Sequence, residues 1–185
     1  RTLLNLWHVE TGFDRDRVLV VQIDPQGSGY EDERLRTLQR EVLVPHPESR
    51  FPGEEEFVFQ HGLLREGAYA MLTEEDRALG HRLAGEWLLQ HGESDALALA
   101  GHFERGGELE LAVHHYVQAA DNTSEADDAQ ALLSCTERGL RCNPPREPRG
   151  ALLSLRGSAH LGHEQYDECI ALATEALELL PAGNR

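Results

Sequence analysis

The chain contains no lysine: all 17 of its basic residues are arginine, against 33 acidic residues. A Walker A loop needs a lysine on the phosphates, a protein kinase needs one on its third strand, and Schiff-base enzymes need one as the nucleophile. None of these three sites can be complete in these 185 residues. The arginine bias, with abundant alanine, glycine, leucine and glutamate, is typical of a GC-rich genome, because the charge type on exposed helices is weakly constrained.

The chain is also poor in cysteine and in long apolar runs. Its three cysteines, Cys135, Cys142 and Cys169, are an odd number on predicted helices, so we expect apolar packing and no disulfide framework. No stretch approaches the roughly 20 apolar residues that span a bilayer, and residue 1 does not begin a signal peptide. We therefore expect a cytoplasmic protein without a membrane partner.

Positive charge is scarce as a whole, and the formal net charge is −16. Nucleic-acid binding draws most of its affinity from clustered Lys and Arg that neutralise phosphates, and no basic stripe with interleaved aromatic residues occurs. The acidic runs at Glu54 to Glu56 and at Asp127-Asp128 are typical of solvated surface. The sequence disfavours a nucleic-acid partner.

Metal and nucleophile motifs are missing as well. The nearest approaches to ligand spacing are His114-His115, His160 with His163, and Cys135 with Cys142, but no CxxC or HExxH occurs. Adjacent histidines lie on different helix faces and cannot readily share an ion. No GxSxG elbow occurs either. We expect no metal site and no catalytic residue in this chain.

Two short helices are predicted between Gly150 and Pro181, and small residues at helical spacing would let their backbones approach closely. The stripes are Leu153, Gly157 and His160 on the first helix and Cys169, Ala173 and Ala176 on the second, which Tyr166 opens and Pro181 ends. This pattern resembles a tetratricopeptide repeat. The resemblance implies a helix pair that buries its apolar face by stacking on neighbouring pairs.

Looser helices of the same kind precede this pair. The pattern comprises Leu99, Ala100 and Phe103, a break at Gly106-Gly107, then Ala112, Tyr116 and Ala119, and a further helix with Leu132, Leu133, Cys135 and Leu140, closed by Asn143-Pro144-Pro145. Ala100 and Ala112 are twelve positions apart, as are Gly157 and Cys169, which groups the first two of these helices as a pair. We expect a right-handed, tetratricopeptide-like helical solenoid over residues 93–185, truncated at its C-terminus.

The segment before the solenoid predicts two strands and two helices. Leu43-Val44 and Phe57 to Phe59 are short apolar strands joined by a Pro- and Gly-bearing loop. A helix should follow from Gly62 to Leu72, and a second should begin at an N-cap Thr73 and run to about Gln90. The expected inward residues are Leu63, Leu64, Ala68, Tyr69 and Leu72 on the first helix, and Leu79, Leu83, Trp87 and Leu88 on the second.

This segment resembles the junction of a winged-helix domain with tetratricopeptide repeats in bacterial signal-transduction ATPases of the STAND class, including those fused to serine/threonine protein kinases. The residues that carry the resemblance are Phe57-Val58-Phe59-Gln60-His61, Leu64-Arg65-Glu66, Ala68-Tyr69 and His81-Arg82-Leu83-Ala84. It covers roughly Glu41 to Pro181 and implies a mostly α chain, with a small winged-helix-like α+β part in residues 1–92. The first 40 residues depart from it, with a strand expected at Arg17 to Ile23 and a helical pattern that resumes through Leu35, Leu38 and Val42.

The resemblance also implies two candidate nucleotide-sensing residues. In related switch ATPases a histidine at the start of a winged-helix helix reaches the bound diphosphate, and His61 occupies a similar place, with Arg65 one turn later. The alternatives are that His61 caps or packs at the strand-to-helix junction and that Arg65 pairs with Glu66 or another acid. The chain itself would hold no cofactor, and ATP or ADP would belong to the parent protein.

These observations favour a non-enzymatic protein-interaction and regulatory module, the sensor arm of a larger STAND-type or kinase-linked ATPase. A protein or small-molecule inducer would bind the repeat surface, with Ser154, Ser158 and Leu161 as groove residues at i, i+4 and i+7, and the parent's nucleotide-binding domain would be the second partner. One alternative is a winged-helix, DNA-binding transcriptional regulator with salt-dependent affinity for duplex DNA. Another is an enzyme acting in trans on a catalytic domain of the parent.

Overall fold

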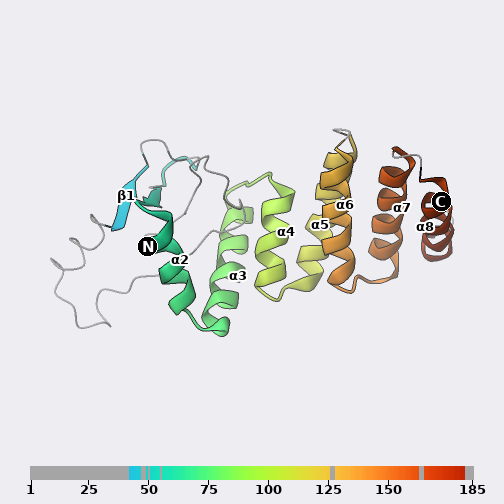
Figure 1. The fold of residues 1–185 in the computed structure, drawn as a ribbon. Helices are drawn as coiled ribbons and strands as arrows, with labels where there is room; N and C mark the ends of the chain where they lie inside the picture. The colour runs from blue at the N-terminus through green and yellow to red at the C-terminus, as the bar shows by residue number, and fades with distance from the viewer. Residues whose placement is uncertain are drawn as a thin grey trace. The chain divides into compact units, whose positions relative to one another are not determined.

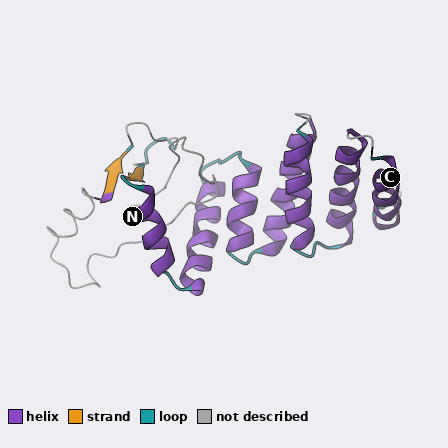
Figure 2. Ribbon diagram, in the orientation of Figure 1, coloured by secondary structure: helices purple, strands orange, loops and turns teal. Residues whose placement is uncertain are grey.

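The computed structural model describes residues 42–46, 49, 51–54, 56–125, 128–162 and 165–181. Over these residues the chain is mostly helical, with seven helices and one two-stranded antiparallel sheet (Figure 1, Figure 2). It divides into two compact units, Arg1–His91 and Gly92–Arg185. None of the described helices combines the length and the apolarity that a bilayer crossing requires. The strand expected at Arg17 to Ile23 and most of the helix expected through Leu35 and Leu38 lie outside the described residues.

The sheet of the first unit pairs β1 (Leu43–Pro45) with β2 (Phe57–Phe59), and Val44 lies opposite Val58. This confirms the predicted strands. Leu43 is buried, and the aromatic side chain of Tyr69 on α2 (Gly62–Met71) packs against it. The predicted inward face of α2 is wrong at its start, because Leu63 is 82% exposed and Leu64 is 42% exposed. The prediction is confirmed at Tyr69 and Leu72, which pack against the buried Leu43.

The next helix, α3 (Glu74–Gln90), begins at the predicted N-cap. The Thr73 hydroxyl oxygen accepts a hydrogen bond from the Asp76 backbone N–H at 3.1 Å and donates one to the Asp76 carboxylate at 2.8 Å, which confirms the cap. The predicted apolar stripe is confirmed at Leu88, which is 1% exposed, and is wrong at Leu79 and Leu83, which are exposed. The buried residues are His81, Ala84, Gly85 and Leu88. His81 can be buried because the Tyr69 hydroxyl and its Nε2 share a hydrogen bond of 2.9 Å.

Five helices form the second unit: α4 (Ala96–Arg105), α5 (Leu109–Glu125), α6 (Ala129–Arg141), α7 (Arg146–Gly162) and α8 (Tyr166–Leu179). Each packs against the next along the chain, and α5 also packs against α7 (Figure 1). Gly107, with φ of +80°, turns the chain between α4 and α5, as the predicted break requires. Asp95 and Asp128 cap α4 and α6 by accepting backbone N–H bonds.

The apolar stripes predicted for α4 and α5 are confirmed. Leu99, Ala100 and Phe103 are 0–3% exposed on α4, and their counterparts on α5 are equally buried. Those counterparts are Ala112, Tyr116 and Ala119, at 0–4%. A further core cluster continues through α6 and α7, where Leu132, Cys135, Leu152 and Ala159 are 0–3% exposed. The second unit therefore has one apolar core that extends along the helices.

The helices of this unit begin at a recurring spacing along the chain, which we call the register. Helix α5 begins at Leu109 and α7 at Arg146, while α6 begins at Ala129 and α8 at Tyr166, so both pairs of starts are 37 residues apart. The spacing of twelve residues in the sequence had grouped α4 with α5. The helix starts instead group α5 with α6 and α7 with α8, and the contact between α5 and α7 agrees with this grouping because equivalent helices then lie beside each other.

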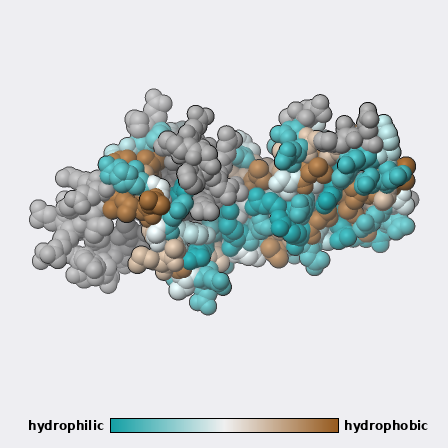
Figure 3. Space-filling model, viewed as in Figure 1, coloured by the Kyte–Doolittle hydropathy of each residue, from teal (hydrophilic) through white to brown (hydrophobic). Residues whose placement is uncertain are grey.

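The last pair packs closely, and the predicted stripes are confirmed at Leu153, Gly157 and Ala176, which are buried. A Cβ added at Gly157 would lie 3.6 Å from the Leu172 Cβ, so a small residue admits α8 there. Ala176 is buried, as expected, whereas Ala173 is exposed. The prediction that Ala173 packs is therefore wrong, because α8 is turned so that Leu172 and Ala176 face α7. On the face drawn in Figure 3, hydrophobic and hydrophilic surface alternate across α6 to α8.

Candidate interaction surface

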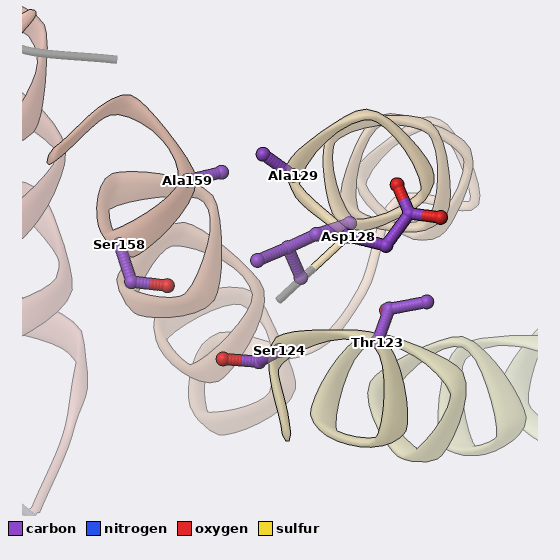
Figure 4. Close-up of a pocket in the computed structure, with 7 residues that line it drawn as sticks. Thr123, Ser124, Asp128, Ala129, Ser158 and Ala159 are labelled. Atoms are coloured by element: carbon purple, nitrogen blue, oxygen red, sulfur yellow. The ribbon is translucent and has the colours of Figure 1, made fainter. Parts of the chain in front are cut away.

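The predicted groove residues Ser154, Ser158 and Leu161 all lie on α7 and are exposed, Leu161 to 53%. One of these three residues lines a cavity. Ser158 lines a hollow of about 170 Å³ between the end of α5, the start of α6 and the last turns of α7 (Figure 4). Ser154 and Leu161 are not among the residues that line it.

The cavity is lined by Thr123, Ser124, Asp128, Ala129, Leu132, Ser158 and Ala159. Figure 4 shows the hydroxyl groups of Ser124 and Ser158 directed toward one another across the opening. The Asp128 carboxylate is directed away from them (Figure 4), and it accepts a hydrogen bond from the backbone N–H of Ala131 at 3.0 Å. The charged group of the lining is therefore engaged in capping α6.

Two of the three hydroxyl groups in the lining, those of Thr123 and Ser158, donate their protons within their own helices. Thr123 Oγ1 donates to the Ala119 carbonyl at 2.7 Å, and Ser158 Oγ donates to the Leu155 carbonyl at 2.7 Å. What these two oxygens still offer is acceptor lone pairs beside apolar side chains. The volume lies below the roughly 300–1,000 Å³ typical of small-molecule pockets. The cavity therefore fits one side chain or backbone amide that donates a hydrogen bond.

A polar cluster joins three helices of the unit. Glu104 on α4 accepts hydrogen bonds at its Oε2 from the Tyr116 hydroxyl of α5, at 2.5 Å, and from Nη2 of Arg138 on α6, at 2.8 Å. The Arg138 guanidinium also lies 5.1 Å from the centre of the Tyr116 ring. We call these three residues the Glu104 cluster.

The electrostatics of the Glu104 cluster indicate a structural role. Burial acts to raise the pKa of Glu104, but the hydrogen bonds from Tyr116 and Arg138 and the arginine charge outweigh it and hold that pKa below its ordinary value. Burial, together with the hydrogen bond to Glu104, raises the pKa of Tyr116 far above its ordinary value. At neutral pH Glu104 stays ionised and Tyr116 stays neutral, so neither is poised for proton transfer.

His115, one of two buried histidines in the unit, and the two buried cysteines are likewise engaged in packing. His115 stacks on Phe103 at 5.5 Å, and burial lowers its pKa even though its Nδ1 shares a 2.9 Å hydrogen bond with Gln118. Burial raises the pKa of the Cys135 and Cys142 thiols, which disfavours the reactive thiolate. In the described part of the chain, no three His, Cys, Asp or Glu side chains are grouped as a metal ion would require.

The two nucleotide-sensing candidates lie at the start of α2. His61 is the N-cap residue of that helix, exposed, and its side chain makes no capping hydrogen bond. Arg65 is half-buried one turn later, and its Nε has no hydrogen-bond partner among the described residues. The structure thus places both residues on one helix end, and their role toward a phosphate stays a prediction.

Sequence reasoning did not find the Glu104 cluster. Glu104 and Arg138 are 34 residues apart, and in the sequence each is one of many charges on a helix surface. A signal was available in Tyr116, whose place on the buried stripe requires a partner for its hydroxyl group. That partner had to be a polar residue on a neighbouring helix.

Protein families, curated proteins and solved structures all yield no match to this chain. Its function is therefore argued from its own residues and their packing.

Proposed function

We propose that this chain is a non-enzymatic protein-interaction and regulatory module, the sensor arm of a larger STAND-type or kinase-linked signalling ATPase. The observation that carries the proposal is the 37-residue register of the helix pairs α5–α6 and α7–α8. This spacing is close to the 34 residues of a tetratricopeptide repeat, and the extended surfaces of solenoids of stacked helix pairs bind other proteins.

The partner would be a protein segment on the exposed face of α7. Ser154, Ser158 and Leu161 present two hydroxyl groups and one apolar side chain there, and Ser158 also lines the cavity beside it. A hollow of about 170 Å³ with acceptor oxygens fits a donor side chain better than a drug-sized inducer. The binding of such a segment would shift the parent between inactive and active states.

The first unit would connect this arm to the parent's nucleotide-binding domain. The β1–β2 hairpin followed by α2 is compatible with the wing and the following helix of a winged-helix domain. His61 and Arg65 at the start of α2 would then approach the diphosphate of ADP bound by the parent. The whole assembly would act in the cytoplasm.

Site-specific photo-cross-linking tests the interaction surface. A photoreactive phenylalanine analogue replaces Ser154 or Leu161 in the full chain expressed in its native cells, and the matched control carries it at Glu168, an exposed position of α8. We expect cross-links to one protein from both α7 positions and none from Glu168. A Ser158→Arg substitution should abolish them by filling the cavity mouth. Equal labelling from all three positions, or no cross-links from α7, would contradict the proposal.

A further inference from the structure

The cavity beside Ser158 has both apolar and polar walls. Its lining combines two kinds of group, the apolar side chains of Ala129, Leu132 and Ala159 and the hydroxyl groups of Thr123, Ser124 and Ser158. Figure 4 shows the two serine hydroxyl groups on either side of the opening. A guest that fits this lining has an apolar stem and a polar end.

The size of the cavity limits the guest to one slender group. Its volume is about 170 Å³. A water-sized group occupies roughly 30 Å³, so the cavity has room for about five or six non-hydrogen atoms. An unbranched alkyl chain that ends in one polar atom is of this size, whereas a nucleotide or a drug-sized molecule is much larger.

The hydroxyl groups favour a guest that only donates hydrogen bonds. Thr123 and Ser158 each donate their proton to a backbone carbonyl of their own helix at 2.7 Å, so they offer a guest only lone pairs. An amide group would also bring a carbonyl oxygen, which these two hydroxyl groups could not pair. An ammonium group has three donors and no acceptor. A guanidinium group also only donates, but its planar fork matches one carboxylate better than hydroxyl oxygens on separate helices.

The charges around the cavity favour a cation. The cavity lies near the C-terminal ends of α5 and α7, and a helix C-terminus stabilises positive charge beside it. Helix α6 begins there with the opposite end of its dipole, but the Asp128 carboxylate caps that end with a full negative charge. This carboxylate is directed away from the serine hydroxyl groups (Figure 4), so it attracts a guest without contacting it. No arginine is among the described residues that line the cavity.

The guest must also come from another molecule. The chain contains no lysine, so neither its own side chains nor those of a second copy can supply an ammonium group to the cavity. Its net charge of −16 attracts a basic partner and repels a second copy.

We infer that the cavity between α5, α6 and α7 binds a primary alkylammonium group, the chemistry of a lysine side chain. The stem packs on Ala129, Leu132 and Ala159, and the head group donates hydrogen bonds to Ser124 and Ser158. This inference rests on the proposed function and specifies its partner, whose segment on α7 places one lysine in the cavity. A free alkylamine has the same chemistry, and the test separates the two sources. A single group of this size binds weakly, with a Kd on the order of 1 mM.

The test titrates the isotope-labelled full chain with acetyl-Gly-Lys-Gly-amide and follows the backbone amide signals by NMR. The matched probe, acetyl-Gly-norleucine-Gly-amide, has the same stem without the ammonium group. We expect the lysine peptide to shift the signals of Ser124 and Ser158 and the norleucine peptide to bind at least tenfold more weakly. A third probe, n-butylamine, identifies the source of the group. If it binds at least threefold more weakly than the lysine peptide, the source is a protein lysine, and if it binds equally or more tightly, the source is a free alkylamine.

Two substitutions should change the affinity in opposite directions. Ser124→Asp places a carboxylate at the opening and should tighten binding of the lysine peptide at least threefold, whereas Ser158→Ala removes an acceptor and should weaken it at least threefold. The matched control Ser134→Asp adds the same charge at an exposed position of α6 that does not line the cavity, and should change binding less than twofold. Circular dichroism and the urea midpoint of each variant verify the fold, which exposed substitutions should leave intact.

Three results would overturn the inference. The first is a titration in which none of the probes shifts the signals of Ser124 and Ser158. The second is equal binding of the lysine and norleucine peptides, which would show that the ammonium group is not recognised. The third is an affinity for the lysine peptide that Ser124→Asp changes no more than Ser134→Asp does.

Cross-linking from Ser154 and Leu161 tests the proposed function separately, because it does not depend on which group enters the cavity. Cross-links to one protein without binding of the lysine peptide would overturn this inference alone. Binding of the lysine peptide without any cross-links would overturn the proposed function and leave the ligand chemistry of the cavity in place.

Discussion

Helices α6 and α8 occupy equivalent places in the 37-residue register. Another helix packs on α6, whereas the equivalent face of α8 is exposed. Thr136 on α6 is 0% exposed, and its equivalent on α8, Ala173, is exposed. Leu140 is half-buried, whereas Leu177 is 49% exposed. The difference lies in the neighbour: α7 packs on α6, and among the described residues no helix packs on the same face of α8. Burial in this unit is therefore decided by the stacking partner as much as by the helix's own sequence.

The largest effect should come from placing a charge at the two equivalent positions. Thr136→Arg buries an unpaired guanidinium beneath α7 and should lower the free energy of unfolding by about 3–5 kcal/mol, enough to unfold the unit. The arginine of Ala173→Arg would lie in solvent, so this substitution should change the free energy of unfolding by less than about 0.5 kcal/mol. Urea unfolding followed by circular dichroism gives both values. Similar losses for the two variants would mean that α6 and α8 are not in the contrasting environments described.

A second contrast concerns two ion pairs of the unit. Glu104→Gln removes the charge of the partly buried ion pair with Arg138 and should cost about 1.5–3 kcal/mol, because charge-assisted hydrogen bonds are weakened there. Glu175→Gln removes the exposed pair with Arg149 and should cost about 0–1 kcal/mol. Urea midpoints of both variants, measured at equal salt, show which substitution destabilises the chain more. If Glu175→Gln lowered the free energy of unfolding more than Glu104→Gln, the Glu104 cluster would not be the interaction that holds α4, α5 and α6 together.

Gly139 and Gly157, two of the glycines in the packed helices, should respond to an alanine substitution with opposite sign. A Cβ at Gly139 would meet Leu152 at 2.9 Å and the Tyr116 Cβ at 3.0 Å, so Gly139→Ala should destabilise the unit by about 1–3 kcal/mol. At Gly157 the nearest contacts are ordinary, at 3.6 and 3.7 Å, and Gly157→Ala should stabilise by up to about 1 kcal/mol through helix propensity. Thermal melting of the two variants and of the native chain shows whether each substitution raises or lowers the melting temperature. A gain in melting temperature for Gly139→Ala would show that α6 and α7 pack less closely.

The smallest expected effect is a pH dependence of the Glu104 cluster. Because the pKa of Glu104 in the folded chain is held below that of the unfolded chain, its stabilisation is complete above the unfolded value, about 4.3. That stabilisation is lost as the pH falls through the folded pKa. The gap in urea midpoint between the native chain and Glu104→Gln should therefore narrow below pH 4 and stay constant from pH 6 to 8. A difference in urea midpoint that grows as the pH falls would contradict this prediction.

The sequence predicted the local structure well where apolar periodicity and turn residues agree. The stripes of α4 and α5, the Thr73 cap and the hairpin of β1 and β2 follow from spacing and capping alone. The cap and the hairpin belong to the first unit, and the two stripes belong to the second.

The failures share a physical cause, because each depends on which neighbour lies beside a helix. Leu79 and Leu83 are as apolar as a core residue, yet His81 takes the buried place on α3 through its bond to Tyr69. Ala173 was expected to pack, but the rotation of α8 against Gly157 directs it to solvent. The Glu104 cluster joins residues from three helices, and no local pattern reveals such a contact. Of the candidate site, the exposed face of α7 could be anticipated and the cavity beside Ser158 could not.

Hydrogen–deuterium exchange of the full chain tests the contrast between α6 and α8 most directly. Amide protection follows the free energy of local opening, which should be high for a helix covered on both sides and low for one covered on a single side. We predict that the amides of α6 exchange at least tenfold more slowly than the equivalent amides of α8. Equal protection along the two helices would contradict the account, because α8 would then be stabilised as fully as α6.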